Sequence, residues 1–111
     1  MHETRITLYD RDMPVRLAVP AGMTPCAGVA ITPNIRLVDG QAVLAGGWCV
    51  VHEPTGLRLT ERVFAQLVDA RAFALLLAAS GLDFTSTAIG GDELARTTVR
   101  ACLAETVGAR P

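Results

Sequence analysis

The residue types that could support chemistry are concentrated between positions 48 and 56. This stretch holds the only tryptophan of the chain, Trp48, together with Cys49 and His52. A Cys–His nucleophile pair requires the thiol and the imidazole to lie within hydrogen-bond reach of each other. Side chains alternate between the two faces of a β-strand, so Trp48, Val50 and His52 should share one face and Cys49 should lie on the other. The spacing therefore argues against a Cys49–His52 dyad.

His52 and Glu53 precede a turn signal at residues 53–56, where they could perform acid–base chemistry or bind a ligand. The other interpretation, which we favour from the sequence, is a solvent-exposed hairpin tip. Asp83, between two predicted helices, is a third candidate for ligand binding. The sequence contains no HExxH, EF-hand or GxSxG pattern, and its three cysteines do not have the spacing of metal ligands. We therefore expect no catalytic residue, no metal site and no cofactor.

The elements that must position these residues change character near residue 60. Before it, apolar and polar residues alternate in short runs that turn residues separate. Asp39-Gly40 predicts a two-residue hairpin, because both central positions of a type I′ turn require a positive φ. Gly46-Gly47 within a strand pattern predicts a bulge or a close backbone approach. We expect five or six short antiparallel strands in residues 1–60.

After residue 60 the apolar residues repeat with a helical period. Thr60 is the predicted N-cap of a first helix, which should end at a left-handed Gly81. Asp92 should cap a second helix that runs from Glu93 to about Val107. The pattern predicts one α+β domain over residues 1–111, with an antiparallel sheet in 1–60 and two α-helices in 61–108 packed on one face of the sheet.

Composition suggests that part of the apolar surface is covered by a partner. Half of the 111 residues are apolar and 19% are charged, whereas about 25% charged residues is usual. A second copy of the chain is the simplest cover. Residues 72–79 are apolar on every side of the first helix, which makes Phe73, Leu76 and Leu77 interface candidates. Trp48 is either a further interface residue or a core aromatic beneath that helix.

The charged residues and the apolar runs bear on other function classes. The formal net charge is −1, and the ten basic residues, all arginine, are scattered along the chain. Sequence-independent nucleic-acid binding is therefore not expected, while sequence-specific DNA recognition through Arg36, Arg58 and Arg62 stays open. No signal-peptide pattern and no apolar run of bilayer length occur. Together with the isolated cysteines, this predicts a cytoplasmic protein without a membrane association.

The segment that joins Ile31-Thr32-Pro33, Asp39-Gly40 and residues 48–57 resembles small uncharacterised proteins of actinobacteria and their phages. Those proteins show a similar Pro-Thr-Gly hairpin before a long Ala-rich helix. The resemblance covers about the middle half of the chain and implies a source in a high-GC bacterium or its phage. It transfers no catalytic residue.

Three hypotheses about function follow from the sequence. The first is a non-enzymatic interaction or accessory module, acting as a homodimer or with another protein partner. The second is a small enzyme or small-ligand-binding domain with a pocket between sheet and helices, using His52, Glu53 or Asp83. The third is a sequence-specific DNA-binding protein, against which the near-neutral charge counts.

Overall fold

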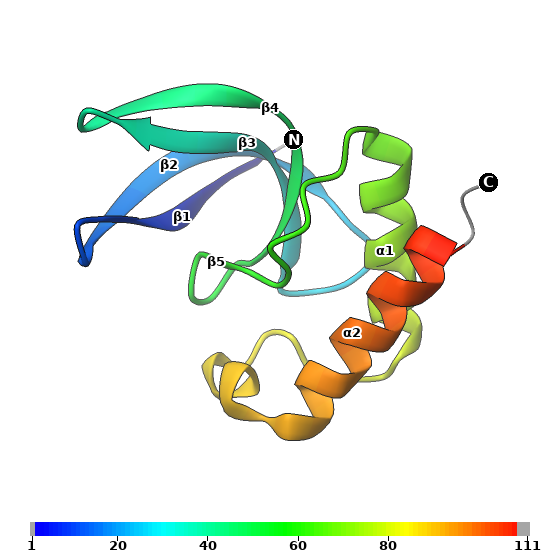
Figure 1. Cartoon of the computed structure of the whole chain (residues 1–111). Coiled ribbons are helices and arrows are strands. Elements are labelled where there is room, and N and C mark those ends of the chain that lie inside the picture. Colours follow the sequence, from blue (N-terminus) through cyan, green and yellow to red (C-terminus); the bar gives the residue numbers. More distant parts are fainter. Residues whose placement is uncertain (1, 109–111) are drawn as a thin grey trace.

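The computed structural model describes residues 2–108, and its elements follow the predicted order of a sheet and then helices (Figure 1). Five antiparallel strands form one sheet in the order of the chain. They are β1 (His2–Asp10), β2 (Met13–Met23), β3 (Val29–Val38), β4 (Gln41–His52) and β5 (Leu57–Arg58). Helix α1 (Leu67–Ala79), the short 3₁₀ helix η1 (Thr87–Gly91) and helix α2 (Glu93–Gly108) follow. The predicted α+β class is confirmed.

Each of the two long hairpins turns through two residues in the left-handed conformation. Asp39 and Gly40 have φ values of 51° and 77°, as a type I′ turn requires. Arg11 and Asp12 have φ values of 51° and 70° at the turn between β1 and β2. The turn between β1 and β2 contains no glycine. The sequence therefore indicated a break between these strands but not the type of turn.

The predicted irregularity at Gly46-Gly47 is a bulge in β4. The register of β3 against β4 shifts there, so that Asn34 of β3 faces residues 45–47 of β4. The Asn34 side-chain amide donates a hydrogen bond of 3.0 Å to the Gly46 carbonyl. A Cβ added at Gly47 would lie 2.6 Å from the side chain of Val63. Both features predicted for this glycine pair, a bulge and a close backbone approach, are confirmed.

The sheet curves until its first strand meets the turn that follows β4. The backbone N–H of Thr7 donates to the Gly56 carbonyl over 2.8 Å, and the Thr7 hydroxyl donates to the Thr55 carbonyl over 2.9 Å. Between β2 and β3, in contrast, only two residue pairs are formed. The two long hairpins therefore separate beyond this junction and leave one side of the curved sheet open (Figure 1).

Two apolar cores lie on opposite faces of β3 and β4. The inner core, inside the curved sheet, consists of Ile6, Val19, Ala21, Ala30, Cys49 and Val51. The outer core lies between the sheet and the helices, and its largest members are Ile31, Val50, Phe64, Phe73, Leu77 and Phe84. Side chains from α1 and α2 both belong to this outer core, as expected for two helices packed on one face.

The predicted start of the first helix is wrong, because α1 begins at Leu67 and not after Thr60. Trp48 and Phe64 exchange two backbone hydrogen bonds of 2.8 Å, which hold the chain extended against β4. Pairing with a distant strand thus overrides the local capping signal of Thr60. The other end of the helix is as predicted, since Gly81 has a φ of 80°.

The second helix begins where it was predicted. The Asp92 carboxylate accepts a hydrogen bond of 2.9 Å from the backbone N–H of Leu94. The linker before it contains η1 and places Phe84, which is 1% exposed, in the outer core. Over residues 2–108, no helix has both the length and the apolar character needed to cross a membrane.

Gly56→Ala should destabilise the protein more than Gly46→Ala. Both glycines have positive φ values, 71° and 84°, where a Cβ costs about 1–2 kcal/mol. A Cβ at Gly56 would also lie 2.6 Å from the Arg5 carbonyl oxygen, whereas at Gly46 it would meet nothing within 4 Å. Urea unfolding followed by circular dichroism should show a loss at Gly56 of roughly twice that at Gly46. Equal losses would contradict tight closure of the sheet at this turn.

Candidate functional site

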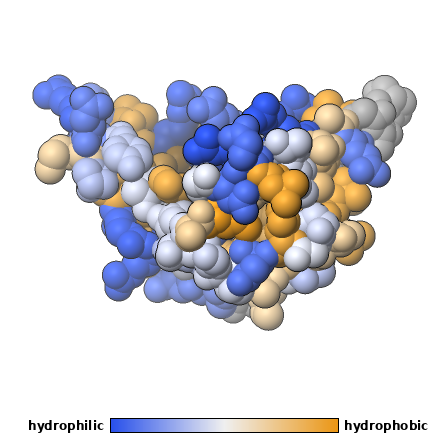
Figure 2. All heavy atoms as spheres, turned by 90° about the horizontal axis from the view of Figure 1, so that it is seen from below, coloured by the Kyte–Doolittle hydropathy of each residue, from blue (hydrophilic) through white to orange (hydrophobic). Residues whose placement is uncertain are grey.

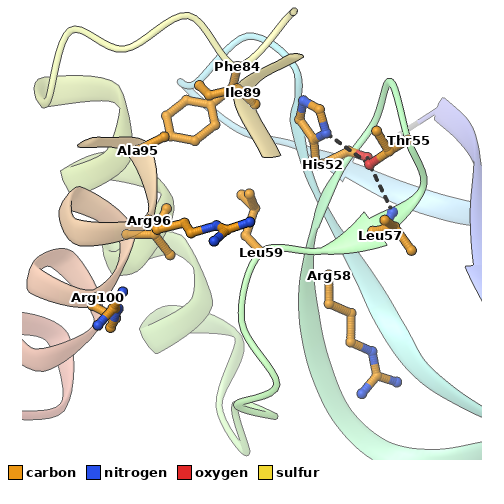
Figure 3. A pocket seen from close by; sticks show the side chains of 11 residues that line it. His52, Thr55, Leu57, Arg58, Leu59, Phe84, Ile89, Ala95, Arg96 and Arg100 are labelled. Carbon is orange, nitrogen blue, oxygen red and sulfur yellow. Dashed lines mark hydrogen bonds between the residues drawn. The ribbon is translucent and has the colours of Figure 1, made fainter. Parts of the chain in front are cut away.

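A pocket of about 370 Å³ lies between the end of β4, β5 and the helical half of the molecule (Figure 3). Its apolar lining consists of Leu57, Leu59, Phe84, Ile89, Ala95 and Val99, and its polar lining of His52, Thr55, Arg58, Arg96 and Arg100. We call it the His52 pocket. Its volume falls in the range of small-molecule sites, roughly 300–1,000 Å³. The pocket between sheet and helices that one sequence hypothesis required is therefore present.

His52 is the buried polar side chain of this pocket, with 3% of its surface exposed. Its Nδ1 lies 2.9 Å from the Thr55 hydroxyl oxygen. Its Nε2 is fully buried and has no hydrogen-bond partner among the described residues. In Figure 3 the ring turns one nitrogen toward Thr55 and the other away from it, on the side of Phe84 and Ile89. An unpartnered buried polar atom costs about 1–3 kcal/mol, so this nitrogen needs an explanation.

The interpretation of His52 as an exposed hairpin tip is wrong. The turn itself has the predicted position, but His52 is only 3% exposed, and residues of η1 and α2 form the opposite wall of its pocket. Nothing in the spacing of residues 48–56 could indicate this pocket, because its opposite wall comes from segments more than thirty residues further along the chain.

The turn after β4 orients the imidazole. The backbone N–H of Gly56 donates to the His52 carbonyl over 2.8 Å and closes the turn. The Thr55 hydroxyl accepts a hydrogen bond of 3.3 Å from the backbone N–H of Leu57 and faces Nδ1 of His52. The orientation of the ring is therefore set by neighbours in sequence.

Three arginines line the His52 pocket, and none of the described lining residues is acidic. Arg58 donates a hydrogen bond of 2.8 Å from Nη2 to Oδ1 of Asn34, and Figure 3 shows its side chain pointing away from His52. Arg96 extends from α2 across the pocket in the same view, and Arg100 lies one turn further along the helix. The two α2 arginines were not among the predicted site residues, and they are next in sequence to the buried Ala95 and Val99.

The other two ligand candidates lie outside the lining of the pocket. The carboxylate of Glu53 is 3.1 Å from Nε2 of His2. Asp83 accepts hydrogen bonds from the hydroxyl and the backbone N–H of Thr85, which lower the pKa of its carboxyl. Within residues 2–108, no three His, Cys, Asp or Glu side chains form a group that could hold a metal ion. Of the three candidates, only His52 belongs to the pocket.

Cys49 lies in the inner core, on the opposite face of β4 from His52, as the alternation predicted. Its thiol donates to Oδ1 of Asn34 over 3.6 Å, and the residue is 1% exposed. Burial raises the pKa of this thiol, and the nearby Arg58 guanidinium partly opposes that effect. Cys49 and His52 therefore do not form a nucleophile pair.

The interface candidates on α1 have different environments. Phe73 and Leu77 have no exposed surface and belong to the outer core, while Leu76 is partly buried. Phe73 and Leu77 therefore cannot touch a partner in this fold. Residues 72–79 are not buried on every side, because Leu75 of the same stretch is 60% exposed.

Trp48 borders a second cavity, of about 420 Å³, which we call the Trp48 groove. It is lined by Pro20, Ala21, Gly22, Met23, Ile31, Pro33, Trp48, Leu67 and Arg71. Trp48 is partly buried against the outer core, and Met23 is 76% exposed. The tryptophan thus both packs beside the start of α1 and faces a groove.

Large apolar side chains remain on the surface in several places. Those more than 60% exposed are Tyr9, Met13, Met23, Leu44, Val68 and Leu94. On the face turned downward in Figure 1, hydrophobic residues gather in the middle and over the helical half, between hydrophilic ones (Figure 2). Part of the apolar surplus noted in the composition is therefore not covered by the chain itself.

The three arginines considered for DNA recognition lie in different settings. Arg58 borders the His52 pocket, Arg62 lines a separate cavity of about 210 Å³, and Arg36 is exposed on β3. They therefore do not line one common cavity.

Comparison with protein-family models, with curated proteins and with solved structures finds no match for this chain. Function is therefore inferred from the geometry of the site.

The free energy of unfolding should decrease as the pH rises above about 9. Burial raises the pKa of all three thiols above the ordinary value of 9.0. The unfolded chain therefore releases these protons first, and the stability is lost from that pH upward. Urea unfolding between pH 7 and about 10 would measure the decrease. The free energy of unfolding of Cys49→Ala should decrease less between neutral and alkaline pH than that of the unmodified chain. An equal decrease in the two proteins would contradict the raised pKa of Cys49.

Proposed function

We propose that the His52 pocket binds a small molecule with an apolar body and a polar group that hydrogen-bonds to Nε2 of His52. The observation that carries this proposal is the buried Nε2 without a partner, in a cavity of about 370 Å³. Buried polar atoms in folded proteins almost always have a hydrogen-bond partner. A ligand with a hydroxyl or amide group would supply that partner.

The proposal assigns binding rather than a bond-breaking step. The polar groups at the pocket are an imidazole, a hydroxyl and guanidinium groups, which are groups that orient a ligand. The carboxylate of Glu53 lies against His2, and that of Asp83 accepts a hydrogen bond from Thr85. Cys49 faces the inner core. This matches the second of the sequence hypotheses in its non-enzymatic form.

Naphthol is a suitable neutral probe, because it combines two apolar rings with one hydroxyl group. We expect saturable binding with one site per chain, measured by calorimetry and by the amide shifts of residues around the pocket. A lack of binding at millimolar concentration, or shifts confined to other parts of the protein, would contradict the proposal.

Two variants of His52 separate a binding role from a structural one. His52→Asn keeps a polar atom near Thr55 and removes the one at the position of Nε2, whereas His52→Gln does the reverse. Naphthol affinity should fall about tenfold in His52→Asn and stay within a few-fold in His52→Gln. The Tm of His52→Asn should instead be higher than that of His52→Gln, because His52→Asn retains the contact with Thr55. Equal naphthol affinities in the two variants would contradict a hydrogen bond to Nε2.

Self-association is a second candidate function, favoured by the exposed apolar surface at the Trp48 groove. Met23, which lines it, is 76% exposed, and tryptophan and methionine are enriched in interfaces. A second copy seated here would form the homodimer expected from composition, on a different surface from Phe73 and Leu77. The chain would then act as an interaction module of a high-GC bacterium or its phage, as its sequence resemblance implies.

Met23→Glu and Met13→Glu form a matched pair for testing self-association. Both methionines are exposed, at 76% and 67%, but Met13 does not line the groove. In sedimentation at high micromolar concentration, the unmodified chain and Met13→Glu should be dimers, and Met23→Glu should be a monomer. A monomeric unmodified chain, or dimers in all three proteins, would contradict the groove as the interface.

A further inference from the structure

We infer that the ligand of the His52 pocket is an amphipathic carboxylate whose charged end lies against Arg96 and Arg100 of α2. This inference rests on the proposed function, to which it adds the charge of the ligand and its orientation.

The charged side chains that line the pocket are all positive. The chain as a whole is balanced, with ten basic and eleven acidic residues. Among the described residues that line the pocket there are three arginines and no acidic side chain. A concave wall with charges of one sign beside an apolar surface raises the local concentration of the opposite ion. The pocket therefore favours an anion over a neutral or cationic ligand.

Two of these arginines are closely spaced on α2. Arg96 and Arg100 are four residues apart, so they are neighbours on one face of α2. Ala95 and Val99, 3% and 8% exposed, anchor the adjacent stripe in the outer core. Like charges at this spacing repel each other. A carboxylate that reaches the guanidinium groups would accept charge-assisted hydrogen bonds from them.

The third arginine, Arg58, is hydrogen-bonded to β3. Nη2 of Arg58 donates to Oδ1 of Asn34 over 2.8 Å and to the Ile35 carbonyl over 3.5 Å. Its guanidinium is therefore directed toward β3 and adds charge to the pocket without reaching into it (Figure 3). Arg96, whose side chain extends across the pocket in the same view, and Arg100 on the next turn of α2 are the arginines that we assign to the anion.

The distribution of polar groups sets the orientation of the ligand. His52 stands at the sheet end of the pocket and the two arginines on the helix opposite, while Leu59 and Phe84 supply apolar wall (Figure 3). A ligand that satisfies both ends carries a hydrogen-bonding group at one end and a carboxylate at the other. Its apolar body lies between them. A small hydrophilic phosphate would leave the apolar lining unused.

Hydroxynaphthoate, with the hydroxyl and the carboxylate at opposite ends of the ring system, is the matched partner of naphthol. We expect the added carboxylate to tighten binding by about tenfold. The double variant Arg96→Gln/Arg100→Gln should lose this gain and bind naphthol as before. Arg36→Gln, which removes an exposed arginine outside the pocket, is the control and should leave both affinities unchanged. Added salt should weaken the binding of hydroxynaphthoate only.

The possible outcomes separate this inference from the proposed function. Equal affinities for the two probes, or a gain that survives the double variant, would overturn the inference and leave the pocket as a site for neutral ligands. A lack of binding by either probe would contradict the proposed function as well. Displacement of hydroxynaphthoate by inorganic phosphate at lower concentration than by acetate would overturn the assignment of a carboxylate.

Discussion

The C-terminal half of β4 is buried on both faces, and the rest of the fold is arranged to cover these two faces. Val50 and Val51 point to opposite sides of the sheet, yet they are only 0% and 1% exposed. A strand with two apolar faces needs a layer of structure on each side. The curvature that brings β1 to the turn after β4 covers the inner face, and α1 and α2 cover the outer one. Both layers are therefore needed to bury the two apolar faces of β4.

At the open side of the curved sheet, a proline in β3 hinders pairing with a strand from another molecule. Pro33 of β3 stands opposite Trp48, whose backbone N–H and C=O are bonded to Phe64. This pair therefore makes no hydrogen bonds between β3 and β4, and the nitrogen of Pro33 faces the edge toward β2. Proline offers no donor there, which hinders the addition of a foreign strand. Met23, which is 76% exposed, lies at this side.

The candidate site follows from the same alternation that builds the two cores. Because Val50 faces the helices, His52 two residues later faces them as well. Near the end of β4 the helical half does not pack directly against the sheet. A cavity lies there instead, and the imidazole of His52 forms part of its wall. A short turn orients the imidazole through Thr55, whose hydroxyl oxygen lies 2.9 Å from Nδ1 of His52.

Local signals in the sequence determined much of the fold. The turn at Asp39-Gly40 and the helix end at Gly81 depend on the backbone energies of single residues, and the faces of β4 depend on alternation alone. Tertiary structure decided what covers each surface. It displaced the helix start from Thr60 by pairing Phe64 with β4, and it buried His52 at the wall of a pocket that η1 and α2 complete. Such contacts join residues far apart in the chain, so their energies leave no trace in local spacing and exceed the small preferences that spacing reveals.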